Sequence, residues 1–132
     1  MGNWIPNDPT LVAQILRISS SYTPPPPEGF VSPMTWGVES HVIERFAAAG
    51  VPADKISFVR DTFTFNYPGT PSAFVDEFRK YYGPTMNAFD AAAKNGRAAD
   101  LQKELEALFG SQNRGQGATS IPATFLRVTV VR

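Results

Sequence analysis

The stretch from Lys55 to Tyr67 reads KISFVRDTFTFNY and is rich in the β-branched and aromatic residues that favour extended strands. Ile56 and Phe58 share one phase of a two-residue alternation, whereas the aromatic residues of the FTFNY end share the other. Such a change of phase indicates either a β-bulge near Arg60-Asp61 or a strand that is covered on both faces. We expect coverage on both faces.

A second strand is predicted from Phe125 to Val131, where apolar and polar residues alternate. Leu126 and Val128 lie in phase on one side of it, as in a half-buried strand. The two strands can pair, but a sheet of two strands is only marginally stable in water. Either the first residues of the chain add a short strand, or a second copy supplies the missing partner by edge pairing or exchange.

Five stretches with helical periodicity fill most of the remaining sequence. Asp8 is a candidate N-cap and Pro9 the first residue of a helix that ends before Thr23, and Thr70-Pro71 repeats this kind of start. The other helices are expected over residues 38–49, 71–82 and 85–94, and from the Asn95-Gly96 interruption to about 109. The sequence therefore predicts a few strands covered by about five helices.

The composition is that of one folded domain over residues 1–132. The chain has 42% hydrophobic and 12% aromatic residues, which is enough for a single core at this length. A proline-rich connector over 24–35 and a flexible polar loop over 111–120 interrupt the regular elements.

Charge and targeting signals favour a cytoplasmic protein without nucleic-acid or membrane partners. The 12 Lys and Arg residues balance the 12 Asp and Glu residues, and neither sign forms the run that binding to a phosphate backbone requires. No apolar run approaches the ~18 residues of a membrane span. The sequence shows no secretory leader and contains no cysteine, so we expect a cytoplasmic location.

Few side chains offer catalytic chemistry. Thiol nucleophiles are absent, and the single histidine, His41, has Glu44 one turn further on, as on a solvated helix face. Asp76 and Glu77 diverge on their helix and make no acid/base pair. The glycines of 115–117 follow a helix and precede a strand, the reverse of the order found in phosphate-binding loops. We therefore predict no catalytic, cofactor-binding or metal-binding residue.

Aromatic side chains are the remaining candidates for a site. Trp and Tyr combine a flat apolar face with a polar tip that needs a partner when buried. A cluster of such side chains forms either a pocket for a flat apolar molecule or part of a plain core. The candidates are Trp4, Trp36, Phe63, Phe65, Phe74, Tyr81 and Tyr82.

Four segments, read in order, resemble the C-terminal part of class I S-adenosylmethionine-dependent methyltransferases of the UbiE-like kind. They are NWIPNDPTLVAQIL (3–16), PPPPEGFVSPMTWGVESHVIERFAAAGV (24–51), ISFVRDTFTFNYPGTPSAFVDEFRKYYGPTMNAF (56–89) and FLRVTVVR (125–132). In that family an element like Asn3–Pro6 lies just past the fifth strand of a seven-stranded sheet, and the other elements follow in the same order. The resemblance spans nearly the whole chain.

The resemblance implies that 55–67 and 125–131 correspond to the sixth and seventh strands and run antiparallel. The expected fold is then α/β (α+β in isolation), a few-stranded, largely antiparallel sheet equivalent to the last strands of that fold. The glycine-rich turn and the acidic residue by which the family binds S-adenosylmethionine have no counterpart here, so the chain would begin where a full-length relative has already completed its cofactor site. Family members shape the acceptor pocket with the region after the fifth strand, and the matching candidate substrate-binding residues are Trp4, Trp36, Tyr81 and Tyr82.

We expect a truncated methyltransferase-like domain that retains the acceptor-side half of the fold and lacks intrinsic methyl transfer. It would bind a small apolar or aromatic molecule or act as a homodimeric module, with no cofactor of its own. The alternative is the acceptor-binding subunit of a split methyltransferase, active only with a separate cofactor-binding chain that supplies the S-adenosylmethionine site. A third reading is a product that folds only because it dimerises and has no selected activity.

Overall fold

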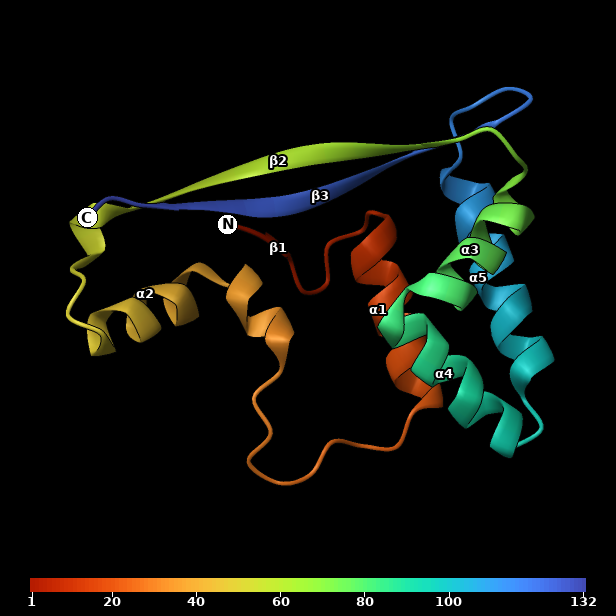
Figure 1. Cartoon of the computed structure of the whole chain (residues 1–132), viewed down its shortest axis with the longest axis horizontal. Helices are drawn as coiled ribbons and strands as arrows, with labels where there is room; N and C mark the ends of the chain where they lie inside the picture. Colours follow the sequence, from red (N-terminus) through yellow and green to blue (C-terminus); the bar gives the residue numbers. More distant parts are fainter.

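The computed structural model describes residues 1–132 as a three-stranded antiparallel sheet with five α-helices, which confirms the expected fold class. The sheet has the order β1-β3-β2, and Figure 1 shows β2 along one border of the molecule with the helices on the side of β3 and β1. The elements are β1 (Gly2–Trp4), α1 (Leu11–Tyr22), the 3-10 helix η1 (Pro33–Gly37), α2 (Glu39–Ala48), the 3-10 helix η2 (Ala53–Lys55), β2 (Ile56–Tyr67), α3 (Pro71–Tyr81), α4 (Gly83–Lys94), α5 (Ala98–Gln112) and β3 (Thr119–Val130).

β2 and β3 form one uninterrupted antiparallel ladder. Each residue from Ile56 to Tyr67 is opposed by one residue of β3, from Val130 to Thr119. This one-to-one register leaves no room for a bulge, in which two residues of one strand oppose one residue of the other. β3 also begins at Thr119 and not at Phe125, so the predicted second strand was too short.

Pro122 explains why the first half of β3 does not look like a strand in the sequence. Proline is rare inside strands because it has no N–H to donate to a ladder. Val131 N–H donates to the Lys55 carbonyl, so the odd-numbered residues of β2 and β3 exchange the ladder hydrogen bonds. Pro122 is even-numbered and its nitrogen faces away from β2, so the missing N–H costs no bond in this ladder.

The two ends of the ladder are covered on opposite faces. Phe65 and Ile121 oppose each other across the strands and pack in the main core. Phe58 and Val128 oppose each other in the other phase and pack in a second cluster. Successive residues of a strand point to opposite faces. The change of phase in the sequence therefore corresponds to the two separate cores, one on each face. Each half of β2 is thus covered on one face only, and the covered face differs between the halves, so the expected coverage of both faces holds only for the strand taken as a whole.

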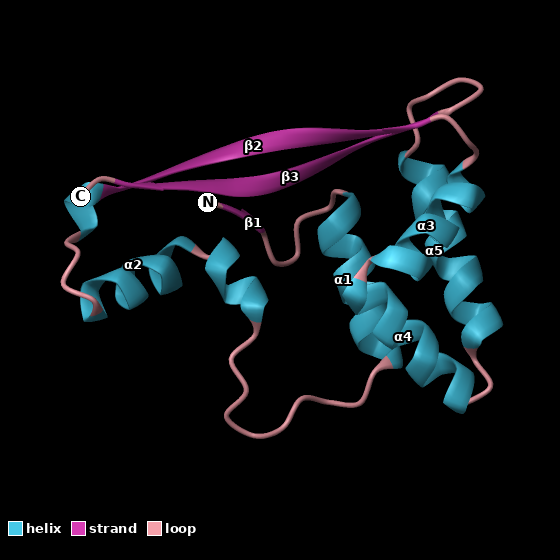
Figure 2. Ribbon diagram, in the orientation of Figure 1, coloured by secondary structure: helices cyan, strands magenta, loops and turns pink.

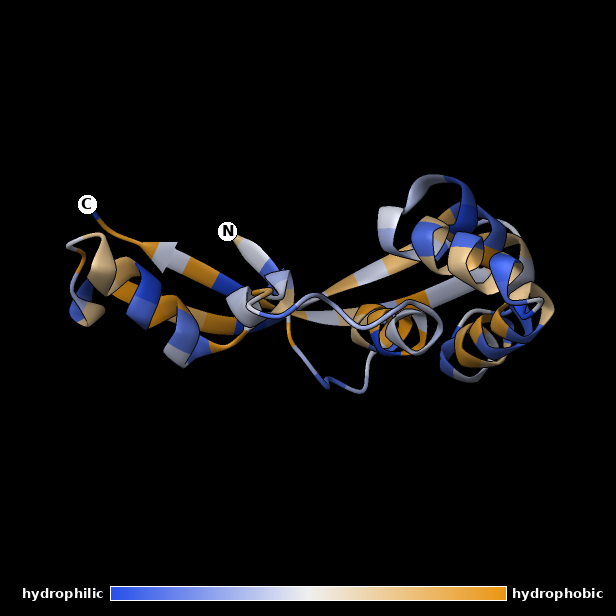
Figure 3. Cartoon of the chain, turned by 90° about the horizontal axis from the view of Figure 1, so that it is seen from below, coloured by the Kyte–Doolittle hydropathy of each residue, from blue (hydrophilic) through white to orange (hydrophobic).

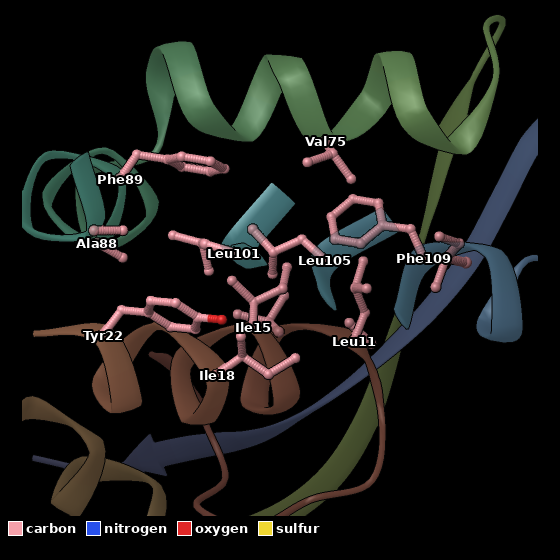
Figure 4. Packing of buried hydrophobic residues seen from close by; sticks show 14 residues of the cluster. Leu11, Ile15, Ile18, Tyr22, Val75, Ala88, Phe89, Leu101, Leu105 and Phe109 are labelled. Atoms are coloured by element: carbon pink, nitrogen blue, oxygen red, sulfur yellow. The ribbon is translucent and has the colours of Figure 1, made fainter. Parts of the chain in front are cut away.

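The main core lies between α1, α3, α4, α5 and one end of β3 (Figure 4). Leu101, Leu105 and Phe109 recur every fourth residue of α5 and are at most 1% exposed. Figure 3 shows hydrophobic and hydrophilic residues interspersed along these helices. The core residues are Leu11, Val12, Ile15, Ile18, Tyr22, Val75, Ala88, Phe89, Ala92, Leu101, Leu105, Phe109, Ile121 and Ala123. None of the helices has the length and apolar character needed to span a membrane.

The second cluster supports the other end of the ladder. Its buried residues are Ile5, Val42, Leu126 and Val128. Trp36 of η1 and Phe46 of α2 pack against it as a T-shaped pair with ring centroids 6.2 Å apart. A Cβ at Gly37 would come within 1.9 Å of the Trp4 carbonyl oxygen, so only glycine allows η1 to lie this close to β1.

Several element boundaries differ from the sequence predictions. α1 begins at Leu11 and not at Pro9, because the Asp8 carboxylate accepts a hydrogen bond from Thr10 N–H at 2.8 Å and forms a turn before the helix. The connector expected over 24–35 ends in η1, although Figure 2 shows a long loop before it. The loop expected over 111–120 is shorter, since α5 extends to Gln112 and β3 starts at Thr119. β1 supplies the short N-terminal strand that was one of the two expected ways to extend the sheet.

Replacing Phe109 with Ala should lower the free energy of unfolding by about 4 kcal/mol, because the ring is fully buried and its loss leaves a cavity. Urea denaturation followed by circular dichroism measures this change. Phe30→Ala is the matched control, since Phe30 is 55% exposed and its truncation should change stability by less than about 0.5 kcal/mol. Equal effects of the two substitutions would contradict the assigned core.

Candidate functional site

A cavity of about 410 Å³ lies between α3 and the strands β1 and β2. Its wall is almost entirely apolar and aromatic, and a single carboxylate interrupts it. The lining residues are Trp4, Val12, Phe65, Phe74, Glu77, Phe78, Tyr81 and Tyr82. Residues that are distant in the sequence thus form one site through the sheet and through the packing of α3 beside it.

Trp4 forms the wall of the cavity that belongs to the sheet. It opposes Phe125 across β1 and β3, and the two rings make a T-shaped contact with centroids 6.2 Å apart. The hydrogen bond from Val128 N–H to the Met1 carbonyl, 2.8 Å long, holds β1 against β3. The indole is therefore fixed by the register of β1.

The opposite wall is a run of aromatic rings on α3 and the residue that follows it. Phe74, Phe78 and Tyr82 are spaced four residues apart, so they lie on one helix face. Phe78 makes T-shaped contacts with Phe74 at 5.2 Å and with Tyr82 at 5.5 Å. The ring centroid of Phe65 in β2 lies 6.0 Å from the ring centroids of both Phe74 and Phe78, so Phe65 joins this wall to the sheet. Edge-to-face packing of this kind restrains the rings that border the cavity.

Thr70 sets the position of this wall. Its hydroxyl accepts a hydrogen bond from Ala73 N–H at 3.2 Å and caps α3, and Pro71 occupies the first turn, as predicted from the sequence. At the other end Tyr82 lies between α3 and α4, where Gly83 and Pro84 begin the next helix. The helix is thus held at both ends beside the cavity.

Polar groups are few in the site. The Glu77 carboxylate lies 3.7 Å from the Lys80 ammonium one turn further along α3. Burial raises the pKa of the Tyr82 phenol above its usual value, so this hydroxyl is neutral at physiological pH and can donate a hydrogen bond. Tyr81 is 78% exposed and lies at the mouth of the cavity.

The structure brings three of the four predicted site residues together. Trp4, Tyr81 and Tyr82 line the cavity, whereas Trp36 does not. Trp36 packs in the second cluster, where the Arg45 guanidinium lies 4.4 Å from its ring centroid. Its place in η1, against Phe46 of α2, depends on the fold of the connector, which has no periodic signal in the sequence.

Glu77, Phe78 and Val12 line the cavity but were not predicted as site residues. Phe78 has the same four-residue spacing as Phe74 and Tyr82, and that spacing was a usable signal. The sequence singles out Glu77 only as the neighbour of Asp76, from which it diverges on the helix. Nothing in the sequence marks Val12, which is 2% exposed and belongs to the core of α1.

A second hollow adjoins the cavity on the sheet. Its lining is Gly2, Trp4, Phe63, Phe65 and Phe125, so it shares Trp4 and Phe65 with the cavity. A Cβ at Gly2 would lie 3.2 Å from the Phe125 ring, so the small residue leaves room for that ring. The two hollows together make an aromatic groove that starts at α3 and continues over β1.

Other groups that might carry chemistry are scattered. His41 lies 4.0 Å from Glu44, and both side chains are exposed on α2. No three His, Asp or Glu side chains gather as a metal-binding group. The Asp61 carboxylate accepts a hydrogen bond from Arg127 across the ladder, away from the cavity. The aromatic cavity is therefore the site whose lining best suits a small apolar ligand.

No protein-family model matches the chain, and neither does any curated protein or any solved structure. The relationship to methyltransferases expected from the four sequence segments accordingly stays a proposal. The cavity and its lining residues are the structural observations from which a function can be inferred.

Tyr82 makes stability depend on pH in the alkaline range. Because burial raises the pKa of the phenol in the folded state, the folded protein holds this proton more tightly than the unfolded chain, whose tyrosines titrate near 10. The free energy of unfolding should thus fall as the pH rises through 10 toward the pKa of the folded state. Denaturation of the wild type and of Tyr82→Phe across this range measures the effect. A loss of stability just as large in Tyr82→Phe would show that Tyr82 is not its source.

Proposed function

We propose that the chain is a binding module for a flat apolar or aromatic molecule, which lies in the cavity between α3, β1 and β2. The observation that carries this proposal is an open cavity of about 410 Å³ with seven hydrophobic residues among its eight lining residues. Pockets for small ligands typically measure roughly 300–1,000 Å³ and combine apolar walls with a few polar groups. A planar molecule of two fused rings is small enough to enter this cavity.

Among the lining residues, Glu77 and Tyr82 are the ones that we propose to supply polar contacts to the ligand, beside a wall that is almost wholly apolar. The carboxylate accepts hydrogen bonds and repels anions, and the neutral phenol can both donate and accept a hydrogen bond. A ligand with a hydroxyl or amine donor at one end of its ring system meets these groups. A ligand with a carboxylate in the same place would meet the charge of Glu77 at short range.

We further propose that this cavity is the acceptor side of a methyltransferase-like fold without methyl transfer of its own. The support is the resemblance of the four sequence segments, together with Trp4, Tyr81 and Tyr82 in one cavity. The chain has no glycine-rich turn between a strand and a helix that would hold S-adenosylmethionine. Binding of the acceptor would then be its own function.

A second candidate is the acceptor-binding subunit of a split methyltransferase. Met1 and Val128 exchange backbone hydrogen bonds of 2.7 and 2.8 Å. Because residues of an antiparallel strand bond alternately to one side and the other, the N–H and C=O groups of Gly2 face away from β3. This short open edge of β1 favours the candidate, because a cofactor-binding chain could extend the sheet there. Methyl transfer would appear only after that chain is added.

Isothermal titration calorimetry with 2-naphthol and with 2-naphthoate tests the binding proposal. We expect saturable binding of 2-naphthol, and binding of 2-naphthoate that is weaker by on the order of tenfold, because the anion faces Glu77. Glu77→Gln should reduce this preference. Phe78→Ala should abolish binding, whereas Phe46→Ala, which removes a ring of the second cluster, should leave it unchanged. Equal binding by wild type and Phe78→Ala would place the ligand elsewhere.

Titration with S-adenosylmethionine alone tests the proposed lack of methyl transfer. We expect the titration to show no saturable binding of S-adenosylmethionine, because the chain has no residues that would hold the methyl donor. Micromolar affinity of the purified chain for S-adenosylmethionine would overturn this part of the proposal and leave the acceptor cavity as a separate question.

A further inference from the structure

The outer edge of β2 has no neighbour within the chain. β2 pairs with β3 on one side only, and the sheet order β1-β3-β2 leaves its other side open. Figure 1 shows this edge on the border of the molecule opposite the helices. The edge runs for the whole length of a 12-residue strand.

The backbone groups of alternate residues point out from this edge. The odd-numbered residues of β2 bond to β3, so the N–H and C=O groups of Phe58, Arg60, Thr62, Thr64 and Asn66 face outward. Thr62 N–H donates to the Asp61 carboxylate at 2.8 Å. The other N–H groups of this set have no partner in the chain, so the edge presents a repeating pattern of donors and acceptors.

The far edge of β3, by contrast, is closed. Ser120 N–H donates to the Asn113 side chain at 2.8 Å, and the Ser120 carbonyl accepts from Arg114 N–H at 2.9 Å. Pro122 has no N–H, and Thr124 N–H donates to the Thr10 hydroxyl at 2.8 Å. β1 pairs with the next residues. The protein therefore satisfies the far edge of β3 with its own groups, whereas the β2 edge stays open along the whole strand.

Apart from the charged pair Arg60-Asp61, the open edge lacks the features that usually prevent strands from pairing. Edge strands are commonly protected by charged side chains, above all lysine, and by proline, a bulge or short length. β2 contains no proline, lysine or glycine, and its register with β3 has no bulge. Two apolar residues of the strand, Val59 and Phe63, are 56% and 54% exposed. Long, regular and partly apolar edges of this kind are templates for another strand.

We propose that β2 pairs antiparallel with β2 of a second copy of this chain, with a two-fold axis at Phe63, and that the two sheets become continuous. In this register Phe63 opposes Phe63 of the second copy, Thr62 opposes Thr64, and Val59 opposes Tyr67. Aromatic pairs, threonine pairs and pairs of aromatic with β-branched residues are favourable across strands. Thr64 N–H donates to the Thr62 carbonyl of the other copy, and Thr62 N–H exchanges its bond to the Asp61 carboxylate for one to the Thr64 carbonyl.

Charge also fits a second copy in this register. Arg60 opposes Asn66, and Asp61 opposes Phe65, so no like charges face each other along the paired strands. The two-fold axis places the main-core helices α1, α3, α4 and α5 of the two copies at opposite ends of the joined strands, because paired strands run antiparallel. Each copy keeps its helices beyond its own β3, away from the interface (Figure 1). The proposal rests on the strand edge and not on a ligand, although Phe63 also lines the hollow beside the cavity and Phe65 lines both.

Single-cysteine cross-linking tests the proposed register directly, because the chain contains no cysteine. Residues that oppose each other between ladder bonds have Cα atoms about 4.5 Å apart, a distance that a disulfide spans. We expect Phe63→Cys to form a disulfide-linked dimer under mild oxidation. Val31→Cys, at a position 66% exposed in the connector, should not. Faster cross-linking at Val59→Cys than at Phe63→Cys would overturn the register.

Analytical ultracentrifugation of the wild type should show a dimer at micromolar concentrations. Thr64→Pro removes an outward N–H without removing a bond to β3, and Phe63→Lys places two like charges on the two-fold axis. Both variants should be monomeric with wild-type circular dichroism, and Val31→Lys should remain a dimer. A monomeric wild type would overturn the proposal, as would a dimer that both variants leave intact or one that forms only with a different protein.

Discussion

The unbroken register between β2 and β3 is the constraint on which the rest of the structure depends. Twelve consecutive residues of each strand oppose each other, so a side chain's face is fixed by whether its number is odd or even. Phe65 is thereby committed to the main core and Phe58 to the second cluster. A slip of one residue would reverse both assignments and expose both sets of apolar side chains.

The aromatic cavity follows from having two cores on one ladder. The helices that bury the main core cover the end of the ladder near Phe65, whereas η1 and α2 cover the other end. Trp4 lies between these regions, because β1 pairs with the middle of β3. The aromatic rings near this point are only partly covered, and the space beside α3 stays open as a site.

Much of the fold could be predicted from the sequence, because helical periodicity and caps such as Thr70-Pro71 act locally. The first half of β3 could not be predicted, because Pro122 argues against a strand there. The strand tolerates Pro122 because the backbone nitrogen of this residue faces away from β2. For the site, aromatic composition pointed to Trp4, Tyr81 and Tyr82. It could not separate them from Trp36, because the connector that carries Trp36 to the second cluster has no periodic signal.

Amide hydrogen exchange measured residue by residue by NMR tests the unbroken register most directly. The N–H groups of Val59, Asp61, Phe63 and Phe65 should all be protected, because each of these residues exchanges ladder hydrogen bonds with β3. Their protection should be similar, with no gap in the middle of the strand. Rapid exchange at Asp61 and Phe63 between protected neighbours would reveal a bulge and contradict the account of the two cores.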